Sequence, residues 1–259
     1  MKNFPALAAV VFCFFLIAAG VSPKQKPRIL VFSKTAGYYH QSIPKGIVTI
    51  QKLGAENNFV IDTTSNAAYF NDDNLSKYAA VIFLNTTGKF FNDSQRVALE
   101  RYMQAGGGFA GIHAAADAEY EWPWYNKLVG AYFLSHPEQQ EAELHIKDAH
   151  HLATRTLPPV WKRKDEWYNF KQVVPGIKIL ITVDEKTYTG GKNGDVHPIA
   201  WYHAVEAGRS FYTALGHTTE SYDESIFQQH LLGGIQYVIG KNKKLNYKKV
   251  IAQYPAAVQ

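Results

Sequence analysis

The amino-acid sequence predicts an α/β protein with an open, mostly parallel, doubly wound sheet and antiparallel additions in its C-terminal half. Three observations predict this fold. Apolar runs suited to buried strands alternate with helical patterns through the first half of the chain. A glycine break, GGG at 106–108, separates a helical pattern from the strand that follows it. Closely spaced strand-like segments replace the alternation in the second half.

The elements of the first half follow in order. RILVFS (28–33) is typical of a strand buried on both faces, and a helical pattern runs from Ile43 to about Asn57. Strands are predicted at FVIDTT (59–64) and AAVIFLN (79–85). The alternation indicates right-handed βαβ units and hence a parallel sheet.

A capped helix and the glycine break follow. Asn92, Asp93 and Ser94 offer N-cap residues for a helix that ends at Ala105. The glycines at 106–108 come after this helix and before the strand FAGIH. A phosphate-binding loop has the opposite order, strand then glycines then helix, so we expect no nucleotide cofactor.

The second half changes character. Strands are predicted at 141–148, 178–184, 199–205 and 208–217, and the last two form a hairpin joined at Glu206-Ala207. A final helix from about Asp223 to Ile239 precedes a polar tail at 241–259. No repeat or linker interrupts residues 28–240, which we interpret as one domain.

The N-terminus is typical of an export signal. Lys2 precedes an apolar segment at 6–17 and small residues up to about residue 22. We expect residues 1–22 to be removed on export to the periplasm; an uncleaved membrane anchor is the alternative, although the apolar segment is short for a span. Cys13 is the only cysteine, so the mature chain would lack disulfides, zinc–thiolate sites and thiol nucleophiles.

The charge is mildly basic, with a formal net charge of +5. Lysine and arginine are spread out except for Lys162–Lys164 and the tail from Lys241 to Lys249, and no basic face with interleaved aromatic residues appears. This pattern predicts a solvated surface, without a nucleic-acid partner and without membrane contact beyond the signal segment.

Three histidines are expected to meet at one edge of the sheet. His40 follows the first strand, His113 ends the strand after GGG, and His217 ends the hairpin. Because function collects beyond the carboxyl ends of parallel strands, these imidazoles should converge although they are far apart in sequence. His113 stands where many α/β enzymes carry a nucleophilic serine or cysteine.

Imidazole at such a position suits acid–base catalysis, metal ligation or hydrogen bonding to a substrate, and a structural histidine is the alternative. His40, His113, His136 and His217, with Glu166 or Asp117, could bind a divalent ion such as zinc. Four other histidines are expected in surface positions or loops: His145, His150, His151 and His230.

Aromatic residues near these segments favour a carbohydrate ligand, because sugar rings stack on aromatic planes and leave hydroxyls for polar side chains. Each could instead pack in the core. The candidate substrate-binding residues are Tyr39, His40, Trp122, Trp124, His136, Trp167 and Tyr168.

The chain from about Arg28 to Gly240 resembles the ThuA-like proteins, named for trehalose utilisation. The motifs that carry the resemblance are GGGFAGIHAAAD (106–117), GAYFLSHP (130–137), DEWYNF (165–170), HPIAWYH (197–203) and FYTALGHTTESY (211–222). The resemblance implies the flavodoxin-like fold of class I glutamine amidotransferases. It places His113 at the position of their cysteine, with His217 and Glu220 similar to their later His and Glu. An imidazole cannot form the thioester of glutamine hydrolysis, so we expect no glutaminase activity.

These expectations combine into an exported protein of carbohydrate utilisation, acting on a disaccharide or keto sugar. His113 and His217 would bind a metal or move protons, Asp117 and Glu220 would orient them, and Glu166 would be a second acid–base group. An isomerase, lyase or hydrolase is expected if it is an enzyme; a glycosidase with paired carboxylates ranks lower. A non-catalytic sugar-binding module and an envelope interaction domain stay as alternatives, and a homo-oligomer is compatible with each.

Overall fold

One nine-stranded sheet forms the centre of the computed structural model, which describes residues 25–241 and 244–253. Its strands, in spatial order, are β2 (Val60–Thr64), β1 (Arg28–Phe32), β3 (Ala80–Leu84), β4 (Gly108–Ile112), β11 (Gly208–Thr213), β10 (His197–Val205), β9 (Lys178–Val183), β6 (Gln140–Ile146) and β7 (Val160–Asp165). The first five are mutually parallel, and every pairing from β11 to β7 is antiparallel. The predicted fold class is therefore confirmed, including the hairpin of β10 and β11.

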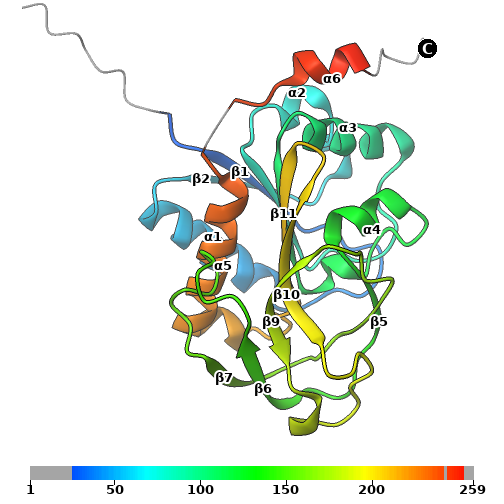
Figure 1. The fold of residues 1–259 in the computed structure, drawn as a ribbon. Helices are drawn as coiled ribbons and strands as arrows, with labels where there is room; N and C mark the ends of the chain where they lie inside the picture. Colours follow the sequence, from blue (N-terminus) through cyan, green and yellow to red (C-terminus); the bar gives the residue numbers. More distant parts are fainter. Residues whose placement is uncertain (1–24, 242–243, 254–259) are drawn as a thin grey trace, which may run out of the picture.

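Helices cover both faces of the parallel part. They are α1 (Ile43–Glu56), α2 (Asp72–Leu75), α3 (Asp93–Gln104), α4 (Pro123–Val129), α5 (Ser225–Ile239) and α6 (Tyr247–Gln253). In Figure 1, α1 and α5 lie to the left of the sheet, and α3 and α4 lie to the right. A separate two-stranded sheet pairs β5 (Tyr132–Ser135) with β8 (Asn169–Lys171).

Local sequence explains the boundaries of α3 and β4. Asn92 and Gln95 form a capping box at the start of α3, and Gly106 ends the helix with a left-handed φ of +98°. A side chain on Gly107 would run into the ring of Tyr102, and one on Gly108 into the backbone of α5. The glycine break therefore ends a helix, as the sequence predicts, and it also lets α3 and α5 pack closely on the sheet.

Strand β7 is the main element that the sequence analysis missed. Its sequence VWKRKD alternates between exposed and buried residues, so Lys162 and Lys164 face solvent whereas Arg163 lies buried. The polar tail contains a helix that the sequence analysis did not predict, because α6 lies against α3 and buries Val250.

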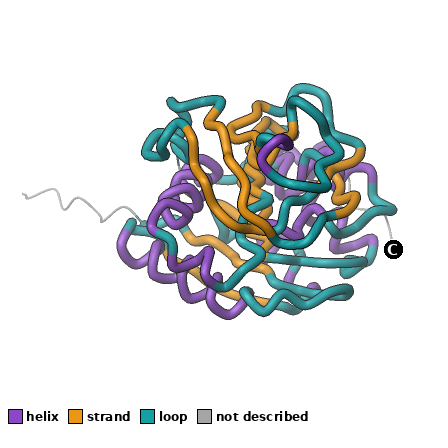
Figure 2. Tube along the Cα trace, turned by 90° about the horizontal axis from the view of Figure 1, so that it is seen from below, coloured by secondary structure: helices purple, strands orange, loops and turns teal. Residues whose placement is uncertain are grey.

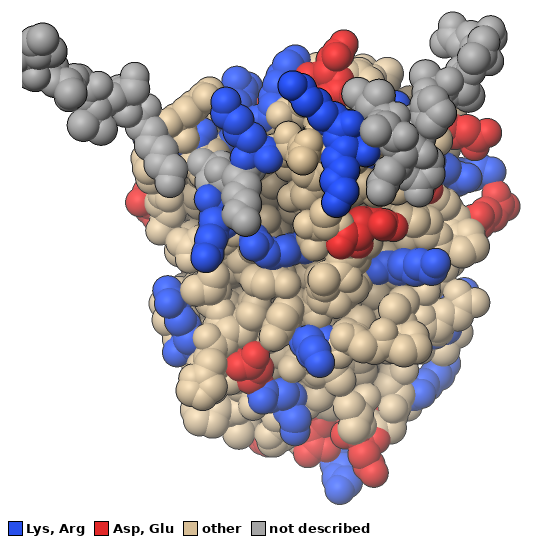
Figure 3. All heavy atoms as spheres, turned by 45° about the horizontal axis from the view of Figure 1, so that its top comes forward, with Lys and Arg blue, Asp and Glu red and all other residues tan. Residues whose placement is uncertain are grey.

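Strands and loops together form the lower end of the molecule, seen from below in Figure 2. Basic side chains, with acidic ones among them, are spread over the face shown in Figure 3 and are densest in its upper part. The predicted signal segment, residues 1–22, lies outside the described residues. Within the part of the chain that the structure describes, no helix combines the length and apolar character required for a membrane span.

Candidate functional site

His113 stands at a sharp turn directly after β4. Its backbone has a φ of +48°, which is unusual for a residue with a side chain, and its side chain is completely buried. The ring nitrogen Nδ1 lies 2.6 Å from the carbonyl oxygen of Ala214, and the ring packs on Tyr168 with a centroid distance of 4.2 Å. A carbonyl oxygen only accepts hydrogen bonds, so Nδ1 carries the proton of the neutral imidazole and Nε2 keeps a lone pair.

That lone pair faces two further polar atoms. Nε2 of His113 lies 3.1 Å from Nδ1 of His217 and 3.3 Å from Oε2 of Glu166, and the last two atoms are 3.1 Å apart. The ring of His40 completes the group, with centroids 5.0 Å from His113 and 5.1 Å from His217. Each of the four residues offers one ligand atom, and all four atoms lie within 4.8 Å of one another. We call His40, His113, Glu166 and His217 the histidine cluster.

The ring nitrogens and the carboxylate of the histidine cluster carry more lone pairs than there are protons for them to bind. Nδ1 of His40 is buried without a hydrogen-bond partner among the described residues, and Nε2 of the neutral His113 ring carries a lone pair instead of a proton. Burial, together with the neighbouring imidazoles of His113 and His217, lowers the pKa of His40 to about 2. Burial acts to raise the pKa of Glu166, but its contacts with the imidazoles of His113 and His217 outweigh burial and hold this pKa below its ordinary value. A positive charge here, whether a proton or a metal cation, therefore stabilises the carboxylate.

A cavity of about 200 Å³ opens above the histidine cluster. Its lining residues come mainly from the loops after β1 and β11, and they are Tyr38, His40, Gln41, Ser42, Gln139, His217, Thr218, Thr219 and Glu220. His113 and Glu166 are not part of this lining, and both are buried. A ligand in the cavity would therefore meet His40 and His217 first.

The remaining predicted polar residues lie around the histidine cluster. Nδ1 of His136 is 3.3 Å from Oε1 of Glu166, so His136 contacts the carboxylate oxygen that faces away from the cluster. Asp117 accepts a hydrogen bond from Tyr120 at 2.6 Å, and burial raises its pKa. Neither Asp117 nor Glu220 forms a hydrogen bond with His113 or His217 among the described residues, contrary to the expected orienting role. The carbonyl of Ala214 orients His113 instead.

The expected aromatic rim forms only in part. Tyr168 contacts His113, and the half-exposed Tyr39 is absent from the cavity lining, where its neighbour Tyr38 packs edge-on against His40 at 4.9 Å. Trp167 is buried and donates to the carbonyl of Gln140. These positions differ from the expectation because the side chain of a loop residue can point toward the cavity or away from it. Sequence spacing does not reveal which direction it takes.

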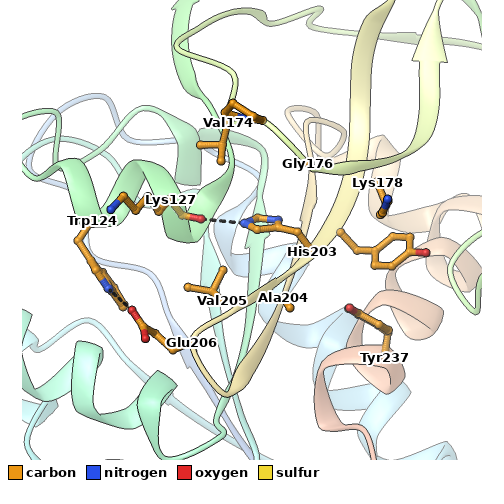
Figure 4. Close-up of a pocket in the computed structure, with 12 residues that line it drawn as sticks. Trp124, Lys127, Val174, Gly176, Lys178, His203, Ala204, Val205, Glu206 and Tyr237 are labelled. Carbon is orange, nitrogen blue, oxygen red and sulfur yellow. Dashed lines mark hydrogen bonds between the residues drawn. The ribbon is translucent and has the colours of Figure 1, made fainter. Parts of the chain in front are cut away.

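Trp122 and Trp124 lie away from the histidine cluster. Trp122 is buried and donates to Glu100. Trp124 lines a separate cavity of about 620 Å³ near the tip of the β10–β11 hairpin, and its indole donates to Glu206 (Figure 4). That tip is at the amino end of β11, whereas His217 follows its carboxyl end, so the two cavities lie at opposite edges of the sheet.

Sequence reasoning missed Asp165, which is fully buried beside Glu166. The only signal was its place in DEWYNF, at the end of an alternating strand. His230 corrects the expectation of a surface position: it is completely buried in α5 and lies within hydrogen-bond distance of Ala153 and Thr213.

A family model described as ThuA, trehalose utilisation, matches residues 28–238. The fold is similar to a ThuA-like protein of Bacteroides uniformis, with a TM-score of 0.73, 22% identity, and coverage of 89% of this chain and 98% of that one. A ThuA-like protein of Parabacteroides merdae gives a TM-score of 0.69, 23% identity, and coverage of 85% and 92%. A β-galactosidase of Bacillus circulans gives 0.54, 12% identity, and coverage of 85% of this chain but 31% of the enzyme. No curated protein sequence matches the chain.

Proposed function

The chain belongs to the ThuA family, which is linked to trehalose utilisation, and from this premise we propose that it acts after export on a disaccharide or keto sugar. The proposed chemistry is metal-assisted proton transfer at the histidine cluster. The observation that carries the proposal is the convergence of three imidazoles and one carboxylate, from four separate segments, under a single cavity.

The histidine cluster fits a divalent metal ion. Three nitrogen ligands and one oxygen ligand suit zinc, and ligand atoms of a tetrahedral zinc site are about 3.3 Å apart, given bonds of about 2.0–2.1 Å. The separations of 3.1, 3.3 and 3.1 Å among His113, Glu166 and His217 agree with this value. The hydrogen bond from His113 to Ala214 fixes the tautomer that leaves Nε2 free, as is common for metal-binding histidines.

A bound divalent ion would polarise a carbonyl or hydroxyl oxygen of the substrate. The chain's own residues would supply the rest of the chemistry. Glu220 lies in the cavity lining, is exposed, and has no hydrogen-bond or ion-pair partner in the described parts of the chain. It is therefore available to accept a proton from a carbon beside a carbonyl. Tyr38 offers an exposed ring face for a sugar, and Gln41 and Gln139 offer amide groups for its hydroxyls.

Glutamine hydrolysis does not suit the side chains of this site. The only cysteine in the sequence is Cys13, in the predicted export signal, and the turn after β4 carries an imidazole instead of a thiol. These side chains support acid–base catalysis on an uncharged sugar.

The decisive experiment measures metal content and proton exchange together. Purified protein lacking residues 1–22 is analysed for metals, loaded with zinc, and incubated in D₂O with a keto derivative of trehalose. Proton abstraction predicts that deuterium replaces the hydrogen beside the carbonyl, observed as loss of one proton NMR signal. His217→Ala and Glu220→Gln should both slow the exchange, whereas only His217→Ala should lose the metal.

Trp124→Ala serves as the matched control, because Trp124 lies at the opposite edge of the sheet. Metal-loaded wild-type protein that exchanges no faster than buffer would reject the acid–base proposal. Sugar binding without exchange would instead identify a binding module.

A further inference from the structure

We propose that Asp165 is a positioning residue that holds Glu166 and His217 at ligand distance from each other. This inference rests on the proposed metal-binding function. Asp165 ends β7, and its side chain lies completely buried beneath the histidine cluster. It does not belong to the cluster itself.

One carboxylate accepts hydrogen bonds from both segments that carry the ligands. Oδ1 of Asp165 accepts from the backbone N–H of Glu166 at 2.9 Å and from that of His217 at 3.3 Å. Oδ2 accepts from the backbone N–H of Gly216 at 3.1 Å. The segment that carries Glu166 and the turn that carries His217 are thus fastened to the same side chain, although they are about fifty residues apart in sequence.

The turn at Gly216 has few other supports. Gly216 has a left-handed φ of +103°, which glycine adopts about as readily as a negative φ, so its own backbone preference does not fix the turn. Its carbonyl oxygen accepts from Ser42 at 3.3 Å and from Asn85 at 3.4 Å, both long contacts. The shorter bond from its N–H to Asp165 is therefore a main determinant of where the next residue, His217, lies.

The negative charge of Asp165 is itself held in place. Arg163 donates to Oδ2 at 3.0 Å and to Ser221 at 2.7 Å, and its side chain is only 2% exposed. The guanidinium also lies over the rings of Trp161 and Phe227. A buried ion pair of this kind is often no more stabilising than apolar residues of similar size, so stability alone does not explain it. A fixed carboxylate orientation, which determines the separation of two metal ligands, does explain it.

The substitution Asp165→Asn distinguishes a contribution to stability from a role in positioning the metal ligands. An asparagine keeps one acceptor oxygen but presents an N–H group at the other position, where it would oppose either the N–H of Gly216 or those of Glu166 and His217. Loss of residues that orient ligands typically lowers metal affinity by about 10- to 100-fold. We therefore expect zinc affinity, measured by calorimetric titration of the metal-free protein, to fall by at least about tenfold.

Glu119→Gln is the matched control. Glu119 is also a fully buried carboxylate that accepts two backbone N–H groups, from Phe90 and Phe91, and pairs with Arg96. It contacts none of the four cluster residues. Both variants should lose a similar amount of thermal stability, but only Asp165→Asn should lose zinc affinity. Equal zinc affinity in Asp165→Asn and wild type, or an equal loss in both variants, would overturn the proposal.

Two further measurements keep the test decisive. If Asp165→Asn does not fold, Arg163→Lys replaces it, since this variant keeps the charge but loses the planar guanidinium whose Nη2 atom bonds both Asp165 and Ser221. An unchanged zinc affinity would then overturn the proposal. If wild-type protein binds no metal, the metal-binding function fails, and the imidazole NMR signals of His217 test the positioning alone. A single, unshifted set of His217 signals in the variant would refute it.

Discussion

The left-handed backbone at His113 leads to a prediction about stability that does not depend on the chemistry of the site. His113→Gly and His113→Ala remove the same imidazole, the same hydrogen bond to Ala214 and the same contact with Tyr168. They differ by one methyl group. The space for this group exists, because the native histidine already has a Cβ atom there. Any difference between the two variants therefore reports on the backbone at a φ of +48°.

The magnitude follows from two opposing effects. A residue with a Cβ atom in the left-handed region costs about 1–2 kcal/mol relative to glycine. Glycine loses more backbone entropy on folding, which costs about 0.5–1 kcal/mol. These ranges leave a net difference of about 0–1.5 kcal/mol. His113→Gly should therefore be more stable than His113→Ala by about 0.75 kcal/mol, or about 2–3 °C in Tm for a domain of this size.

Urea denaturation of the metal-free variants, followed by tryptophan fluorescence, measures this difference. A matched pair at the buried, extended strand residue Ala110, native protein against Ala110→Gly, should show the opposite order. If His113→Ala is the more stable of the two variants, the turn after β4 does not hold residue 113 in a left-handed conformation. Both His113 variants should also lose bound metal.

Three further predictions concern single side chains. Glu166→Gln should reduce zinc affinity by more than the about 10- to 100-fold typical of residues that only orient ligands, measured by calorimetry, and an unchanged affinity would remove Glu166 from the ligand set. Burial lowers the pKa of His230 to about 4 from 6.5, so its contribution to stability is complete above about pH 6.5 and is lost as the pH falls toward 4. At about pH 5 this loss is about 2 kcal/mol, and His230→Gln should show a shallower decline of urea midpoint with falling pH; parallel declines would contradict the assigned burial. Tyr38→Ala should weaken sugar binding about fivefold without changing metal content, whereas unchanged sugar affinity would exclude stacking on this ring.

The convergence of distant histidines could be predicted because parallel topology imposes it. Strand periodicity and the glycine break place His113 and His217 at carboxyl strand ends, and β4 and β11 are indeed adjacent and parallel. The same reasoning failed for Trp122 and Trp124, which follow His113 closely in sequence. The chain turns away from the site between Asp117 and α4, and nearness in sequence does not determine direction after a turn.

By itself, the sequence determined the fold class and the order in which strands and helices alternate along the first half of the chain. It also determined the edge of the sheet at which His40, His113 and His217 meet. These follow from the periods of strands and helices, which are local properties of the chain. Only the tertiary structure decided that Glu166 is the fourth member of the cluster, that Tyr38 rather than Tyr39 lines the cavity, and that Asp165 fastens two ligand segments together. Those facts depend on hydrogen bonds and contacts between segments about fifty or more residues apart, or on the rotation of a loop side chain, and no local pattern encodes either.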